Sequence, residues 1–347
     1  MNSKIDITRE QVARFIEAIA DPALVVKADG LIIAVNQNAN ALFEQHLLNH
    51  NISLAVRTPA INSAVAEAFS QEKSSVVQHQ LHAPISRSFD VFITPLNMME
   101  QASPLALLTF KDLTYEEQIE RMRTDFVANA SHELRTPLAS LAGFIETLQG
   151  AAKNDPKAKD EFLKLMKAQA DRMARLIEDL LSLSRIETTE HVAPSGVVDL
   201  TAMAKQTRDL LQGLAQEAKC EMKLDLPQSL LVIGDANQLS QVIYNLVENA
   251  IKYAGANKSV VMTGTAQGNT AIFTVRDFGQ GIEEHHIPRL TERFYRVSAQ
   301  DSRMRGGTGL GLAIAKHILK RHRGKIQIES KLGEGSSFSI HLPSSLS

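Results

Sequence analysis

The chain has 347 residues, of which 44% are hydrophobic and 22% charged, an ordinary globular composition that predicts about two or three domains. Its 37 basic and 39 acidic residues give a net charge of −2, so no basic excess indicates a nucleic acid partner. The single cysteine, Cys220, excludes an intrachain disulfide and a cysteine-rich metal site, and it fits a reducing compartment.

Hydrophobic patterning predicts no membrane span. The longest apolar runs, such as 104–110, are far shorter than the roughly 20 residues of a membrane-spanning helix. The N-terminus also lacks the apolar core of a signal peptide. We therefore expect the chain as given to be soluble and cytoplasmic, and the residues leave open whether it belongs to a longer protein.

The first region, residues 10–112, has the pattern of a small α+β domain. A short helix is predicted over 12–19, and the alternating or apolar runs after it are typical of β-strands. The sequence Lys-Ala-Asp-Gly at 27–30 separates two of these runs and is a signal for a hairpin turn. The region therefore predicts an antiparallel sheet.

Residues 113–190 change to a helical pattern with a turn at 154–156, where Asn-Asp-Pro marks a new helix start. The seam positions of both helices recur at steps of three and four residues. They are Val127, Ala130, Leu134, Pro137, Leu141, Phe144 and Leu148 in the first helix, and Phe162, Met166, Gln169, Met173, Leu176, Leu180 and Leu183 in the second. One hairpin has too little surface to bury its seam, so we expect a homodimer in which two hairpins form a four-helix bundle. We assign 113–125 to a helical linker and 126–190 to the dimerisation domain.

Residues 195–343 alternate between helices and strands, as expected for an α/β sandwich with helices on one face of a mixed sheet. The predicted helices cover 200–218, 236–253 and 310–321, and the predicted strands cover 259–267, 270–279, 325–331 and 336–343. Gly324 follows the basic end of the last helix and is predicted to be its C-cap. The whole chain is thus expected to be a multidomain α+β protein.

A histidine in the first long helix stands out. The seam places His132 on the outer face, and Thr136, one turn later, addresses the same exposed spot. A lone histidine is more often an ordinary surface residue. Here, however, Pro137 cannot donate to the carbonyl of Glu133 and would bend the helix, at a cost of about 3 kcal/mol in an ordinary helix interior. Such a cost favours a functional reason for the cluster.

The sequence "SHELRTPL" at Ser131–Leu138 resembles the phosphoacceptor box of bacterial sensor histidine kinases. The resemblance implies that His132 is the residue that becomes phosphorylated. A solvent-exposed neutral imidazole is a suitable nucleophile near neutral pH. Glu133 would accept a hydrogen bond from the other ring nitrogen and take up the proton, and Thr136 would orient water when such proteins dephosphorylate their partner.

Four later segments resemble, in order, the nucleotide-site motifs of the same family, and 333–338 resembles its terminal glycine turn. The four are 245–254, 277–281, 292–296 and 306–314. They imply a GHKL-type fold that binds ATP with Mg²⁺.

Asn245 and Asn249 lie one helical turn apart with Glu248 beside them, and amide oxygens suit Mg²⁺ that is also bound to phosphates. By resemblance, Asn249 holds the magnesium ion, Lys252 contacts phosphate and Tyr253 lies against the adenine.

By the same resemblance, Asp277 accepts a hydrogen bond from the adenine amino group, and Gly279 and Gly281 let the backbone approach the base. Arg296 would balance charge on the transferring γ-phosphoryl group. A glycine-rich loop would contact phosphate at a helix N-terminus, which favours anions. Its predicted binding residues are Gly307, Thr308, Gly309, Leu310 and Gly311. The polar segment 297–306 is predicted to be a lid over the nucleotide.

Residues 16–43 resemble the opening of a PAS sensory domain whose ligand the residues do not indicate, and 112–126 resembles a helical signalling linker. The order of sensor and linker, and the amino-acid sequence of residues 122–152, resemble those of phosphate-regulon sensor kinases. Because that subfamily usually has N-terminal membrane segments, a longer form anchored in the bacterial inner membrane stays open.

These features predict an ATP-dependent protein-histidine kinase of a two-component system. It would phosphorylate itself on His132, transfer the phosphoryl group to an aspartate on a response regulator receiver domain, and also act as the phosphatase. Phosphate-starvation sensing follows from the subfamily resemblance.

Two alternatives are a GHKL-type ATPase of the chaperone or topoisomerase kind, and a catalytically silent PAS and dimer scaffold. The histidine box argues against the first. The presence of His132, Asn249 and Asp277 argues against the second. The paired histidines in 283–286 and the basic run 320–325 are interpreted as solvated surface and a helix C-terminus, rather than a metal site and a nucleic acid site.

Overall fold

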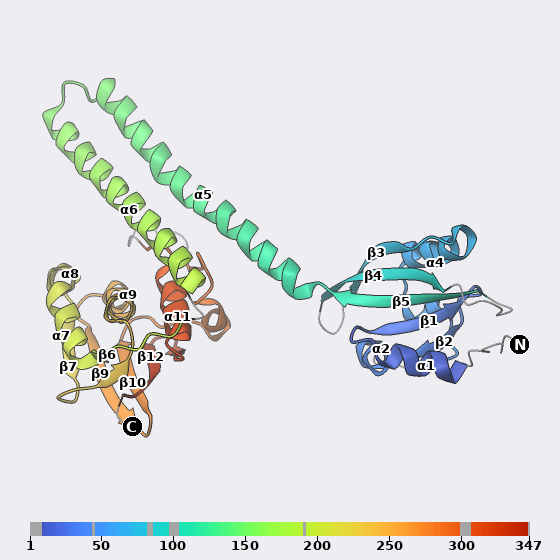
Figure 1. Cartoon of the computed structure of the whole chain (residues 1–347). Coiled ribbons are helices and arrows are strands. Elements are labelled where there is room, and N and C mark those ends of the chain that lie inside the picture. The colour runs from blue at the N-terminus through green and yellow to red at the C-terminus, as the bar shows by residue number, and fades with distance from the viewer. Residues whose placement is uncertain are drawn as a thin grey trace, which may run out of the picture. The chain divides into compact units, whose positions relative to one another are not determined.

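The computed structural model describes residues 9–43, 46–81, 86–96, 104–189, 192–298 and 307–345 (Figure 1). The chain forms two compact units, Met1–Asp125 and Phe126–Ser347. Both units contain helices and strands, in the order expected from the sequence. The predicted multidomain α+β fold class is therefore confirmed. Among the described helices, none combines the length and the apolar composition that crossing a bilayer requires.

The first unit contains a five-stranded sheet with the strand order β2-β1-β5-β4-β3, in which each neighbouring pair is antiparallel. Its strands are β1 (Ala23–Lys27), β2 (Ile32–Val35), β3 (Ser75–Leu81), β4 (Arg87–Leu96) and β5 (Leu105–Asp112), and its helices are α1 (Arg9–Glu17), α2 (Gln37–Phe43), α3 (Ile52–Ala55) and α4 (Pro59–Gln71). The β1–β2 hairpin confirms the predicted turn, at which Gly30 has a φ of +81°.

Successive side chains of β1 point to opposite faces of this sheet, and each face packs against a different helix. Leu24 and Val26 belong to the core shared with α4, whereas Val25 belongs to a second core shared with α1. The first helix was predicted over 12–19 but spans Arg9–Glu17. Its end differs because Ala18 and Ile19 donate to carbonyls three residues back, which tightens the last turn.

Hydrogen bonds to Ser88 of β4 fix the beginning of α5 (Thr114–Gln149) in the first unit. The Ser88 carbonyl accepts the N–H of Leu113 at 2.8 Å, and the Ser88 N–H donates to Thr114 Oγ1 at 3.1 Å. The Ser88 hydroxyl donates to Glu117 Oε2 at 2.8 Å. The helix therefore starts at a defined position on the sheet.

Helices α5 and α6 (Pro156–Thr189) form the predicted hairpin, and α5 continues through Pro137, which is buried. Asp155 begins α6, because its carboxylate accepts the N–H groups of Lys157 and Ala158, and Pro156 occupies the first helical position. Within one chain Phe126 is half-buried, with its ring centroid 6.0 Å from that of Phe294, and Val127 is 58% exposed.

The rest of the second unit is an α/β sandwich. Its main sheet has the order β11-β12-β10-β9-β7, with β7 parallel to β9 and the other pairs antiparallel. The strands are β6 (Val197–Asp199), β7 (Glu221–Asp225), β8 (Leu231–Ile233), β9 (Ser259–Gln267), β10 (Thr270–Asp277), β11 (Lys325–Lys331) and β12 (Gly335–Pro343). The helices are α7 (Leu200–Leu210), α8 (Gln212–Glu217), α9 (Ala236–Ala254), the 3-10 helix η1 (Glu284–Arg289) and α11 (Gly311–Arg321).

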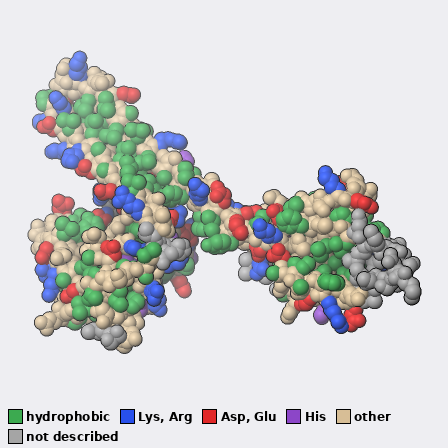
Figure 2. Space-filling view, viewed as in Figure 1, with side chains coloured by type: hydrophobic (Ala, Val, Ile, Leu, Met, Phe, Trp, Pro, Cys, Tyr) green, Lys and Arg blue, Asp and Glu red, His purple; other side chains and the backbone are tan. Residues whose placement is uncertain are grey.

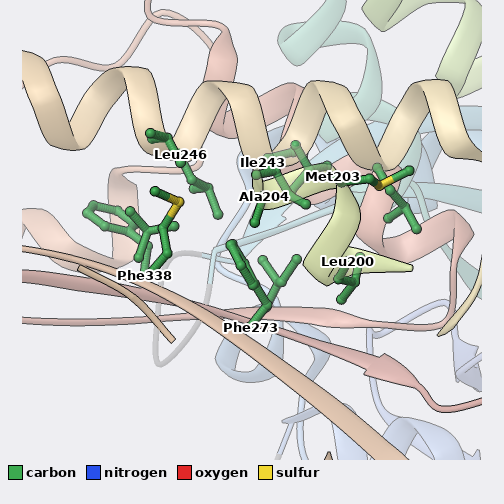
Figure 3. Packing of buried hydrophobic residues seen from close by; sticks show 14 of the residues in the cluster. Leu200, Met203, Ala204, Ile243, Leu246, Phe273 and Phe338 are labelled. Atoms are coloured by element: carbon green, nitrogen blue, oxygen red, sulfur yellow. The ribbon is translucent and has the colours of Figure 1, made fainter. Parts of the chain in front are cut away.

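The core of the sandwich lies between the helices and one face of this sheet. Ile243 and Leu246 of α9 lie above Phe273 of β10 and Phe338 of β12, and all four belong to one buried cluster (Figure 3). The apolar residues of α9 recur with the helical period, so the polar residues between them lie away from the core.

Two predicted details of this domain are wrong. The helix predicted over 200–218 is two helices, which meet at Leu211, a buried residue with φ −92° and ψ 5°. Gly324 is not the left-handed C-cap of α11, since Arg323 takes the positive φ of 54°. Glycine is required at 324 because a Cβ there would lie 2.4 Å from the His341 carbonyl oxygen of β12.

A buried histidine, His322, joins the C-terminal end of α11 to the N-terminal end of α9. His322 is 3% exposed, and its Nδ1 donates to the Ile318 carbonyl at 2.7 Å. Its Nε2 accepts the N–H of Asp235, the N-cap of α9, at 2.9 Å. Both ring nitrogens thus have partners only in the neutral form, and burial lowers the pKa of His322.

We predict that this domain loses stability in mild acid. Because the folded pKa of His322 lies below its unfolded value of 6.5, the unfolded state binds the proton first, and the free energy of unfolding falls as the pH drops below 6.5. One such group changes stability by at most about 1.4 kcal/mol per pH unit.

Urea unfolding at several pH values, followed by tyrosine fluorescence, measures the slope of the free energy of unfolding against pH. His322→Gln should flatten it, and His285→Gln, a change at an exposed side chain of the same domain, should not. Equal slopes for His322→Gln and the unaltered protein would contradict the assignment.

Candidate nucleotide and phosphoacceptor site

A cavity of about 460 Å³ lies beside the polar face of α9. It is within the range of roughly 300–1,000 Å³ that is usual for small-molecule sites. It brings together most of the residues that the sequence predicted to bind nucleotide: Asn245, Glu248, Asn249, Lys252, Tyr253, Asp277, Gly281, Arg296, Gly307, Thr308, Gly309 and Gly311. Gly279 and Leu310 do not line it, and Leu310 is fully buried in the core behind it.

Helix α9 carries five of these residues. The Asp235 carboxylate caps its N-terminus by accepting the N–H groups of Asn237 and Gln238 at 3.0 and 3.1 Å. The Asn245 side chain donates to the Gly311 carbonyl at 3.1 Å, which joins α9 to the first residue of α11. Asn249 lies one turn further along the same face, on the cavity wall.

Asp277 supplies a buried carboxylate at the end of β10. It is 3% exposed, and its Oδ1 accepts the N–H of Gly279 at 2.8 Å. Burial raises the pKa of Asp277, and the backbone hydrogen bonds oppose that shift. A carboxylate in this position can accept a further hydrogen bond from a ligand in the cavity.

The two glycines after Asp277 are required by the protein's own backbone. A Cβ at Gly279 would lie 2.1 Å from the Tyr253 carbonyl oxygen. A Cβ at Gly281, which has a φ of +72°, would lie 2.1 Å from the Lys331 carbonyl oxygen. These close contacts, rather than room for a ligand, account for glycine at both positions.

The two cations predicted to contact phosphate are paired with carboxylates. Lys252 Nζ lies 2.9 Å from Glu248 Oε2. Arg296 Nη2 donates to Glu133 Oε2 at 3.0 Å and to the Gly307 carbonyl at 2.9 Å. Arg296 Nε is buried and has no hydrogen-bond partner in the described parts of the chain. The backbone of Gly309, at φ +75°, lies so close to the Arg296 Nε that a Cβ on Gly309 would be 3.2 Å from that nitrogen.

The phosphoacceptor box lies on α5. His132 is exposed, and Thr136 Oγ1 donates to its backbone carbonyl at 3.3 Å. Glu133 is half-buried, and its Oε2 also accepts from Arg172 of α6 at 3.2 Å. Consecutive residues on a helix face different directions, so the Glu133 carboxylate meets two arginines, and no bond to the His132 ring is found among the described residues.

Sequence reasoning missed the contribution of α6. Arg175, Glu178 and Asp179 line the cavity. The Thr308 hydroxyl donates to Asp179 Oδ2 at 2.7 Å. Polar residues at 172, 175, 179 and 182 step along α6 with the helical period, beside its apolar seam, and this stripe was the available signal.

Among the described residues, no group of three or more acidic, histidine or cysteine side chains that could hold a metal ion occurs. His285 is exposed, as interpreted from the sequence. His286 is half-buried, with its Nδ1 2.6 Å from the Tyr295 hydroxyl. Residues 299–306 of the predicted lid lie outside the described residues.

Comparison with protein families places two domains in the chain. Residues 122–189 match the His Kinase A (phospho-acceptor) domain, and residues 234–346 match the family described as histidine kinase-, DNA gyrase B- and HSP90-like ATPase. The chain belongs to the sensor histidine kinases. The expected resemblance is therefore confirmed, and the ATPase domain of this sensor kinase supports the use of ATP.

Two curated sensor kinases are similar over about two thirds of the chain. The phosphate regulon sensor protein PhoR of Pseudomonas aeruginosa is 40% identical over 235 residues, which are 68% of this chain and 53% of PhoR. The sensor-like histidine kinase SenX3 of Mycolicibacterium smegmatis is 35% identical over 69% of this chain and 62% of its own. The chain thus spans only about half to three fifths of these relatives.

Solved sensor kinases share the fold. The histidine kinase AdeS of Acinetobacter baumannii is 27% identical, with a TM-score of 0.50 over 62% of this chain and 98% of that chain. The histidine kinase ThkA, in its complex with the response regulator protein TrrA, has a TM-score of 0.53 over 95% of this chain and 97% of its own. At 21% identity, that likeness concerns the fold alone.

We predict that Gly279→Ala destabilises the sandwich domain, because its Cβ would meet a backbone carbonyl that cannot move cheaply. Overpacking of this kind costs about 1–3 kcal/mol. Gly213→Ala is the matched control, since Gly213 lies in α8 with nothing within 4 Å of a Cβ. It should be neutral or raise stability by up to about 1 kcal/mol. Thermal unfolding followed by circular dichroism compares the two, and a lower melting temperature for Gly213→Ala than for Gly279→Ala would refute the assignment.

Proposed function

We propose that the chain is an ATP-dependent protein-histidine kinase of a two-component system, which phosphorylates itself on His132. The observation that carries the proposal is one compact unit that holds both an exposed histidine in a phosphoacceptor domain and a cavity lined by the nucleotide motifs. A GHKL-type ATPase of another kind would have no use for the phosphoacceptor histidine. A silent scaffold would have no use for the cavity with its nucleotide motifs.

In this proposal the cavity binds ATP with the adenine near Asp277. The buried carboxylate accepts a hydrogen bond from the adenine amino group, and Tyr253 lies against the ring. The phosphates lie toward Lys252, Arg296 and the residues of the glycine loop. The buried, unpartnered Nε of Arg296 fits an anionic group there, because a buried donor without a partner costs about 1–3 kcal/mol.

Magnesium would be held by Asn249, with Asn245 and Glu248 beside it. Mg²⁺ commonly takes one or two protein ligands and completes its shell with phosphate oxygens and water, so this small set of oxygen ligands would suffice. When bound, the ion would supply positive charge against the phosphates.

The phosphoryl transfer itself needs few protein groups. A nitrogen of the exposed His132 ring attacks the γ-phosphorus, an N–P bond forms, and the P–O bond to ADP breaks. Glu133 takes up the ring proton, which requires that its carboxylate first leave Arg172 and Arg296. Arg296, released from Glu133, then balances charge on the transferring group.

The helical hairpin would form a homodimer. Large apolar side chains remain exposed along both helices (Figure 2). They are Tyr115, Ile119, Met122, Val127, Leu138 and Ile145 on α5, and Leu163, Leu165, Ile177 and Leu181 on α6. A second hairpin in a four-helix bundle would remove them from water.

We assign residues 10–112 to a PAS-like sensor domain, 113–125 to a linker, 126–190 to dimerisation and phosphotransfer, and 195–343 to ATP binding. The partner would be the receiver domain of a response regulator, the class of protein bound to ThkA. The likeness to PhoR supports a role in phosphate-starvation sensing. We place the chain in the cytoplasm, as part of a protein anchored in the inner membrane in its longer form.

The kinase assignment predicts that γ-labelled ATP and Mg²⁺ give an acid-labile, alkali-stable label on the protein. His132→Gln should reduce this label to background, because a phosphoramidate needs the ring nitrogen. His285→Gln, at another exposed histidine, should leave it within about twofold. Label that survives His132→Gln would remove His132 from the proposal, and nucleotide binding without any label would favour the scaffold.

Phosphatase activity is assigned to Thr136. Thr136→Ala should lower dephosphorylation of a phosphorylated regulator by at least about tenfold relative to autophosphorylation, because the water loses its orienting group. Thr136→Ser, which keeps a hydroxyl, should retain most of the ratio. The two activities are measured on the same preparations, and equal ratios for alanine and serine would count against Thr136.

A further inference from the structure

The Thr308 hydroxyl joins α6 to the loop that begins α11. It donates to Asp179 Oδ2 at 2.7 Å and accepts the N–H of Leu310 at 3.3 Å. Leu310 is the N-cap residue of α11 and provides no side-chain cap. A carboxylate from the helical hairpin is therefore linked, through one hydroxyl, to the positive end of α11.

The surroundings of Asp179 disfavour a second negative charge. Burial is the largest cause of the raised pKa of Asp179, and the charges of Glu248 and Glu178 add to that shift. The hydrogen bond from Thr308 and the charge of Arg175 oppose it. A phosphate that reached Thr308 would have to share its hydroxyl with this carboxylate or displace it.

A second carboxylate of the hairpin pairs with another side chain that is proposed to contact phosphate. Glu133 of α5 binds Arg296, which the proposed function assigns to the γ-phosphoryl group. Arg296 also donates to the Gly307 carbonyl, so both contacts meet in the segment Gly307–Leu310. The hairpin thus presents two anions where the nucleotide would present its phosphates.

We propose that Asp179 is a positioning residue that competes with nucleotide phosphate for Thr308, so that docking of α6 and binding of a triphosphate oppose each other. The proposal rests on the proposed function and adds the residue through which α6 acts on the nucleotide. Like charges at close range in a partly buried site repel more strongly than in water. The opposition should therefore act on the phosphates and leave the nucleoside nearly unaffected.

The test measures the affinity of the full chain for a non-hydrolysable ATP analogue and for adenosine by isothermal titration calorimetry. Asp179→Asn keeps an oxygen acceptor for Thr308 and removes the charge. It should raise the affinity for the analogue at least about fivefold and change that for adenosine less than twofold. Asp179→Ala, which removes the acceptor as well, should raise the affinity for the analogue at least as much.

Asp171→Asn is the matched control, because Asp171 lies on the same helix, is exposed and pairs with Lys167. It should leave both affinities within twofold. In a Thr308→Val background, which lacks the hydroxyl, Asp179→Asn should give clearly less gain than in the unaltered chain. An equal gain in both backgrounds would overturn the route through Thr308.

The failure of this proposal differs from the failure of the proposed function. An Asp179→Asn variant that binds adenosine normally and the analogue no more tightly would overturn the competition and leave the kinase assignment intact. An unaltered chain that binds neither ligand would overturn the proposed function itself. Adenosine affinity also reports whether each variant is folded.

Discussion

The packing of α9 on the sheet is the constraint from which the geometry of the cavity follows. Ile243 and Leu246 are fully buried above the strands, and a buried side chain of this size contributes about 1.5–3 kcal/mol. Once that face is committed to the core, the helical period fixes the direction of Asn245 and Asn249. The polar wall of the cavity is thus held in place by apolar contacts on the opposite side of the same helix.

Carboxylates of the helical hairpin bind groups of the sandwich domain beside the cavity. Glu133 meets Arg172 and Arg296, and Asp179 meets Thr308. Exposed ion pairs contribute little, but the Arg296 side chain is only 7% exposed, so leaving it unpaired would be costly. Arg296 therefore needs an anionic partner, which Glu133 supplies here, and in the proposed function a nucleotide phosphate would take its place.

Much of the fold could be predicted from local patterns. The limits of β9 and β11 agree with the predicted strands, and the hairpin turn falls where Asn-Asp-Pro interrupts the helices. The break at Leu211 was not predicted, because leucine favours helices and no local pattern marks the change at that residue. The motifs collected most of the cavity residues, since each motif is a short stretch of one element. The contact between Asp179 and Thr308 joins residues 129 positions apart, and no local pattern contains it.

The neutral imidazole of His322 bears on how the cavity can adapt. It joins the C-terminal end of α11 to the capping residue of α9, and both helices provide walls of the cavity. With one end of each helix fixed to the other, the helices are expected to move as a single rigid body. Adjustment to a ligand is then expected in the segments around these two helices, such as Gly307–Leu310, rather than between the helices themselves. The helices that carry the polar wall therefore have little conformational entropy left to lose on binding.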